Sequence, residues 1–101
     1  MSAAADVITI AARWQPAEGK LGEVLALIAE MRPKSLAEPG CLGYEVYRGV
    51  DQPHQLLLLE HYASAAALEA HRQSEHYRTL VVERALPLLA ARQVEVLQAR
   101  A

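Results

Sequence analysis

The sequence predicts an α+β fold of the ferredoxin-like type, with the element order β-α-β-β-α-β and an antiparallel sheet covered by helices on one face. Two observations support this prediction. Apolar residues alternate with a period of two in four segments, and they recur at helical spacing in the segments between. The chain has 101 residues, so we expect a single domain over 1–101 with a core of about 6–99.

The first strand is predicted over residues 7–14, where Ile8, Ala12 and Trp14 lie on one face. A turn follows, and from Glu18 the apolar residues are spaced as on one side of a helix. Pro33 removes a helical hydrogen bond and is expected to kink this helix or to end its regular part.

The next two strands are predicted over residues 41–48 and 55–62, with a loop between them. In the first of these strands, period-two alternation places Cys41 on the same face as Tyr47. The second strand contains four consecutive leucines, which indicates a central strand covered on both faces.

The last third of the chain is predicted to contain two helices and a strand. Ser64 is a natural N-cap for a helix over residues 65–73. A second short helix over residues 75–84 carries Tyr77 on its apolar stripe. Alternation over residues 93–100 then predicts the final strand.

The open face of the sheet predicts a homodimer. Helices can cover only one face, and side chains such as Tyr47 and Val96 are expected on the other. Hydrophobic residues make up 52% of the chain, which is high for so small a protein. A second subunit packed on the open face would bury this surface.

Charge and composition exclude several classes of function. The formal net charge is −2 and there is no basic block, so no nucleic-acid partner is expected. No apolar run reaches the ~20 residues of a membrane span, and no signal peptide is evident, so we expect no membrane association and a cytoplasmic location. Cys41 is the only cysteine, and His71 and His76 are five residues apart, off the helical i, i+4 spacing, so we predict no metal.

The groups suited to catalysis gather around one predicted strand-to-helix junction. Glu60 and Tyr62 end the apolar strand, His71 lies on the following helix, and His76 and Tyr77 open the next one. For each of these residues a structural role competes with the catalytic one. Glu60 could orient an imidazole or form a structural ion pair, Tyr77 could belong to the core, and His76 could be solvent-exposed.

Three segments resemble the antibiotic biosynthesis monooxygenase family. They are EPGCLGYEVY at residues 38–47, Glu60-x-Tyr62, and ALEAHRQSEHY at residues 67–77. With the opening strand and turn, the resemblance covers roughly residues 6–99. It implies a dimer of ferredoxin-like subunits whose sheets pack face to face (a dimeric α+β barrel), and a cavity between sheet and helices in each subunit.

The resemblance also implies a function. Members with known chemistry oxygenate phenolic or quinol-type substrates with molecular oxygen and without metal or flavin. The expected catalytic residues are then His71 as the base with Glu60 and Tyr62, and the expected contacts to a small hydrophobic or aromatic ligand are His76, Tyr77 and Leu58. No cofactor is expected, and oxygen would be the co-substrate.

Two alternatives remain open: a proton-transfer isomerase of a small, sugar-like metabolite, and a non-catalytic dimer that binds a small molecule. Haem cleavage, known in other relatives, is not expected. Ala12 stands where haem-degrading relatives carry Asn, Tyr62 replaces their Trp, and Val81 and Val82 lie where the axial histidine would be.

Overall fold

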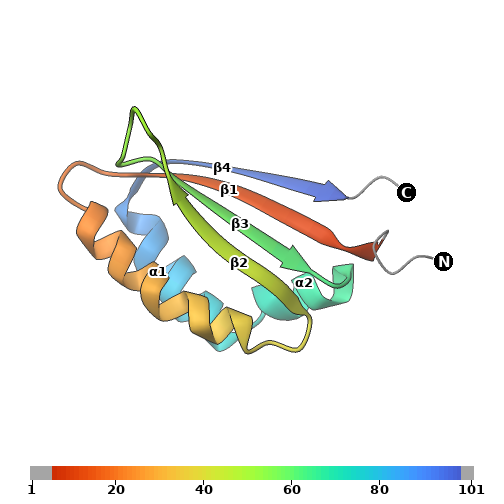
Figure 1. Ribbon diagram of the computed structural model, residues 1–101. Coiled ribbons are helices and arrows are strands. Elements are labelled where there is room, and N and C mark those ends of the chain that lie inside the picture. Colours follow the sequence, from red (N-terminus) through yellow and green to blue (C-terminus); the bar gives the residue numbers. More distant parts are fainter. Residues whose placement is uncertain (1–5, 99–101) are drawn as a thin grey trace.

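The computed structural model describes residues 6–98, which form a four-stranded antiparallel sheet with helices on one face (Figure 1). The sheet order is β2-β3-β1-β4. The predicted ferredoxin-like α+β fold is confirmed. In chain order the elements are β1 (Ile8–Pro16), α1 (Leu21–Leu36), β2 (Cys41–Arg48), β3 (Leu56–Tyr62), α2 (Ala65–Arg72), the π-helix η2 (Tyr77–Ala85), the 3₁₀ turn η3 (Leu86–Leu88) and β4 (Leu89–Gln98).

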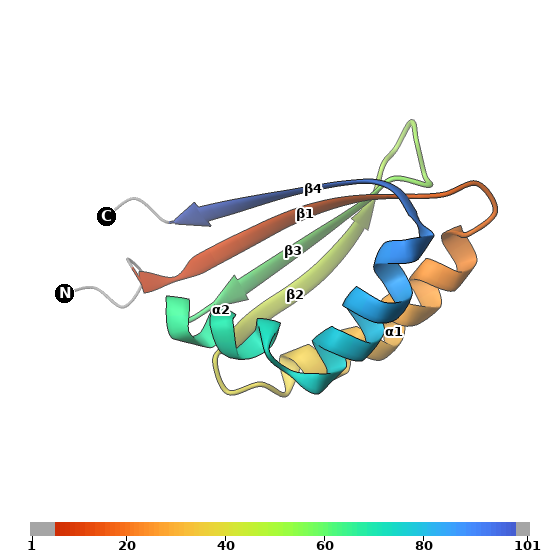
Figure 2. The ribbon, with the colours of Figure 1, turned by 180° about the vertical axis from the view of Figure 1, so that it is seen from behind.

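The core lies between the sheet and the pair of long helices, α1 and η2, which run side by side on the same face (Figure 2). β1 contributes Ile10, Ala12 and Trp14 to this core, and β3 contributes Leu56 and Leu58. The register sets Trp14 opposite Leu56 and Ala12 opposite Leu58, so these side chains share the helix-covered face.

A β-bulge in β2 makes the prediction for Cys41 wrong. Cys41 pairs with Tyr62 and Gly43 pairs with His61, which leaves Leu42 as an extra residue in the ladder. Because the extra residue reverses the alternation, Cys41 turns to the helix-covered face while Tyr47 stays on the open one. The buried thiol therefore belongs to the core.

The prediction for Val96 is also wrong. Val96 pairs with Ile10 on the helix-covered face, yet it is 57% exposed. β4 is an edge strand, and in the described part of the chain no helix packs closely against it. The strand begins at Leu89 rather than at residue 93, and its predicted end at residue 100 lies outside the described residues.

The helix predicted over residues 75–84 is not an α-helix in the structure. Residues Tyr77–Ala85 wind as a π-helix, a rare structure that often occurs at functional sites. The β-branched residues Thr79, Val81 and Val82 weaken the α-helical preference of this segment. The wider turns leave Leu80, Val81 and Ala85 buried against the rest of the core. None of the helices over residues 6–98 is long and apolar enough to span a membrane.

Gly40 holds the turn before β2 close to α2. The backbone N–H of Ala63 donates to the carbonyl of Gly40 at 2.8 Å, and a Cβ on Gly40 would lie 2.3 Å from the Cβ of Ala67. We expect Gly40→Ala to lower the free energy of unfolding by about 1–3 kcal/mol through this clash. Urea denaturation measures it.

Gly22→Ala is the matched control, because no atom lies within 4 Å of a Cβ on Gly22 in α1. This substitution should stabilise the protein by about 0.5 kcal/mol. Equal effects of the two substitutions would contradict the close packing of Gly40 on α2.

Candidate active site

A cavity of about 290 Å³ lies between the sheet and the helices. Its apolar wall comes mainly from β1, β4 and η2. Its polar groups converge from β2, β3, α2, η2 and β4, and are Tyr44, Glu60, His71, Arg72, Tyr77 and Arg92. A small space with an apolar wall and convergent polar groups has the form of a ligand site.

Glu60 is a buried carboxyl group on β3. Pairing with Ile10 and Tyr44 places it on the helix-covered face, where its exposure is 7%. The hydroxyl of Tyr62, two residues further on the same face, donates a hydrogen bond of 2.6 Å to Oε1 of Glu60. Burial raises the pKa of Glu60 to about 7, although the bond from Tyr62 opposes this shift.

His71 comes from α2, whose first turn is capped by the Ser64 side chain, which accepts from the N–H of Ala67. His71 is 3% exposed. Its Nδ1 lies 2.9 Å from Oε2 of Glu38, and its Nε2 lies 3.7 Å from Oε1 of Glu60. Since a carboxylate only accepts, Nδ1 carries the proton and Nε2 keeps its lone pair.

The contact between His71 and Glu60 is not an ion pair at neutral pH. Burial lowers the pKa of His71, and this outweighs the opposite effect of the Glu38 carboxylate. A neutral imidazole therefore stands with Nε2 directed toward the side chain of Glu60. A neutral imidazole next to a cavity is suited to accept a proton.

Glu38 was not identified from the sequence. It lies in the turn between α1 and β2, and its Oε2 also lies 2.5 Å from Nε2 of His76. Of the two carboxyl groups near His71, Glu38 lies within hydrogen-bond distance of the imidazole, at 2.9 Å, whereas Glu60 lies at 3.7 Å. The only sequence signal was its place before Pro39-Gly40, which is informative once this turn is known to pack against α2.

Glu38, His71 and His76 could also hold a metal ion. Their ligand atoms lie within 4.8 Å of one another in the part of the chain that the structure describes. Two imidazoles and a carboxylate suit several divalent metals. The i, i+4 spacing on which the prediction of no metal rests applies only to two residues of one continuous helix. His71 lies in the last turn of α2 and His76 precedes η2, so this spacing does not govern the distance between them.

The other predicted residues divide into two groups. Tyr77 lines the cavity, and its ring centroid lies 5.1 Å from that of His71. Tyr62 and Leu58 are 0% exposed and lie in the core behind Glu60 without lining the cavity. His76 is on the Glu38 side of His71 and does not line it either. The side chain of His76 is only partly exposed.

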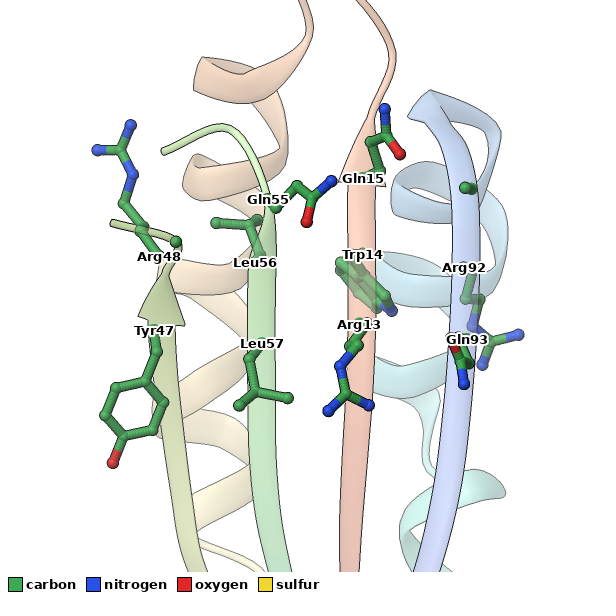
Figure 3. Close-up of a pocket in the computed structure, with 12 residues that line it drawn as sticks. Arg13, Trp14, Gln15, Tyr47, Arg48, Gln55, Leu56, Leu57, Arg92 and Gln93 are labelled. Carbon is green, nitrogen blue, oxygen red and sulfur yellow. The ribbon is translucent and has the colours of Figure 1, made fainter. Parts of the chain in front are cut away.

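A larger hollow of about 480 Å³ lies over the sheet near the loop end of β2 and β3. Figure 3 views it from the helix-free side, with Arg13, Tyr47 and Leu57 on the open face. None of the described residues that line it is a carboxylate, histidine or cysteine, so they offer no general base. We therefore take the smaller cavity as the candidate active site.

Comparison with known proteins agrees with this architecture. A model of the antibiotic biosynthesis monooxygenase family matches residues 7–83. "Putative monooxygenase Rv0793" from Mycobacterium tuberculosis is 36% identical over 70 residues, or 69% of this chain and 68% of that protein. The solved structure of Rv0793 has a TM-score of 0.87 at 31% identity and covers 94% of this chain and 96% of that chain. A conserved protein from Methanosarcina mazei Go1 shares the fold, with a TM-score of 0.90 at 22% identity and 97% coverage of both chains.

Proposed function

Since the chain belongs to the antibiotic biosynthesis monooxygenase family, we propose that it oxygenates a small phenol or quinol with molecular oxygen, with His71 as the base. The observation that supports this most is the buried, neutral imidazole of His71. Its Nδ1 is fixed by Glu38, and its Nε2 is directed toward the carboxyl group of Glu60, which lines the same cavity.

Proton removal is the step for which these residues are suited. A free phenol has a pKa of ~10, and an apolar site raises it further, so an adjacent base is needed to form the phenolate. Nε2 of His71 would accept this proton. The electron-rich phenolate can then react with oxygen: one oxygen atom enters the ring and the other leaves as water, while the phenol supplies four electrons and becomes a quinone.

The neighbouring residues act as positioning groups in this proposal. Glu38 holds the tautomer in which Nε2 is free. Tyr62 acts through Glu60, because its hydroxyl is already committed to that carboxyl group. The ring of Tyr77 faces His71 edge-on and forms part of the substrate wall. The proposed chemistry uses no cofactor, since the substrate supplies the electrons.

Oxygen consumption tests the proposal. With a panel of hydroquinones and naphthols, we expect oxygen uptake above the rate without protein and formation of the quinone. Uptake should persist after dialysis against EDTA, whereas its loss would indicate that Glu38, His71 and His76 hold a catalytic metal. Substrate conversion under strict anaerobic conditions would favour the isomerase. If compounds of the panel bind but none is converted, the result would favour a non-catalytic dimer that binds a small molecule.

The proposed assembly is a homodimer through the open sheet face. On this face Tyr47 is 51% and Leu97 is 47% exposed. We expect Tyr47→Glu to convert a dimer of twice 11.1 kDa into a monomer, because a charge would be buried at the interface. Sedimentation velocity measures the mass.

Val82→Glu is the control for this substitution, since Val82 is 46% exposed on η2, away from the open face. It should leave the dimer intact. A wild-type protein that sediments as a monomer would refute this assembly, and so would a dimer that persists in Tyr47→Glu.

A further inference from the structure

Two arginines border the candidate active site without a partner of their own. Arg72 ends α2 directly after His71, and Arg92 lies on β4, and both line the cavity. Within residues 6–98 neither side chain forms an ion pair or a hydrogen bond. By contrast, Arg13 pairs with Glu95 and Arg78 pairs with Glu83.

The charges of these arginines reach into the cavity. Both Arg72 and Arg92 act to lower the pKa of Glu60, against the dominant effect of burial. They come from two different elements, Arg72 from a helix and Arg92 from the edge strand. An unpaired guanidinium at the mouth of a cavity favours an anionic ligand, and its planar donors match a carboxylate in bidentate geometry.

Trp14 provides a second, independent indication of a polar ligand. It is 4% exposed and lines the cavity, yet its Nε1–H has no hydrogen-bond acceptor among the described residues. Trp14 pairs with Arg92 across β1 and β4, so both lie on the helix-covered face. Figure 3 shows the indole nitrogen on the side of the ring toward β4. A buried donor without an acceptor is unfavourable, and a ligand oxygen would satisfy it.

We propose that the substrate carries a carboxylate which binds the guanidinium groups of Arg72 and Arg92, and that its oxygens supply the acceptor for Nε1 of Trp14. This inference rests on the proposed function for the phenolic part of the molecule. The volume of about 290 Å³ is at the small end of ligand pockets, which suits one or two rings. The substrate class is therefore a hydroxylated aromatic acid.

Trp14 is also the reporter for the test, because it is the only tryptophan in the chain. Under nitrogen, its fluorescence is titrated with 2,5-dihydroxybenzoate and with hydroquinone, which differ by the carboxylate alone. Calorimetry replaces fluorescence if the signal does not change. We expect the acid to bind at least tenfold more tightly, and Arg72→Gln and Arg92→Gln to weaken it about tenfold each while hydroquinone binding stays unchanged.

Arg84→Gln is the matched control, since Arg84 is an exposed arginine on η2 that does not line the cavity. It should bind the acid as the wild type does. Equal affinities for the acid and hydroquinone would overturn the inference. Variants of Arg72 and Arg92 that still prefer the acid would also overturn it. So would tighter binding of 4-hydroxyphenyl phosphate than of the acid. If the protein takes up oxygen with hydroquinone but does not prefer the acid, the carboxylate site is refuted and the oxygenase function stands. If the protein prefers the acid but turns over no substrate, the oxygenase function is refuted and the carboxylate site stands.

Discussion

Replacement of His71 by alanine should lower kcat/KM for oxygen uptake by about 10²–10⁴-fold, the range of general-base catalysis. Among residues 6–98 the imidazole of His71 is the one nitrogen base that lines the cavity, and Glu38 fixes it in the tautomer that leaves Nε2 unprotonated. The wild-type rate should fall at acid pH as the imidazole becomes protonated. Because burial lowers the pKa of His71, this fall should occur below the usual histidine range.

His61→Ala is the control for this variant. His61 lies on the open face of β3, where its Nδ1 is 2.8 Å from the hydroxyl of Thr9. It should keep the wild-type rate. Thermal unfolding of both variants separates loss of catalysis from loss of structure. A folded His71→Ala protein with the wild-type rate would remove His71 from the mechanism.

The element order could be predicted from the sequence because hydrophobic periodicity reflects which face of each element is buried. The bulge at Leu42 could not be predicted, since it arises from pairing with β3 rather than from the residues of β2. The start of β4 was missed for a similar reason. Residues 89–92 have no alternation, and only pairing with β1 makes them a strand.

The sequence allows prediction of those residues of the candidate site that lie close together in the chain. Glu60 and His71 flank one strand-to-helix junction and were both named. Glu38 was missed because it meets His71 only when the turn before β2 packs on α2. Arg92 was missed because it fell outside the predicted strand, so that no face was assigned to it.

Replacement of Glu60 by glutamine should stabilise the folded protein at alkaline pH. Burial raises the pKa of Glu60 from 4.5 to about 7 in the folded state, so the folded state holds its proton more tightly than the unfolded state. The contribution of Glu60 to the stability of the wild type is therefore fully present below pH 4.5 and is lost as the pH rises through 7. At 1.36 kcal/mol per pKa unit, the loss amounts to about 3 kcal/mol.

Glutamine keeps an oxygen to accept the bond from Tyr62 and does not ionise. The free energies of unfolding of the variant and the wild type should nearly agree at pH 4, and the variant should be more stable by up to about 3 kcal/mol at pH 8.5. Urea denaturation at a series of pH values measures this difference. The charged and titratable groups that face Glu60 are the same in both proteins, namely Glu38, Cys41, Tyr44, Tyr62, His71, Arg72 and Arg92.

Glu30→Gln removes an exposed carboxylate from α1 and controls for the change in net charge. A difference between Glu60→Gln and wild type that stays constant from pH 4 to 8.5 would show that Glu60 is not held protonated by burial. A variant that gains stability at alkaline pH and also keeps oxygen uptake would assign proton removal to His71 alone. If the gain in stability comes with loss of turnover, the ionised Glu60 takes part in the reaction, and the protein retains a destabilising buried carboxylate for that purpose.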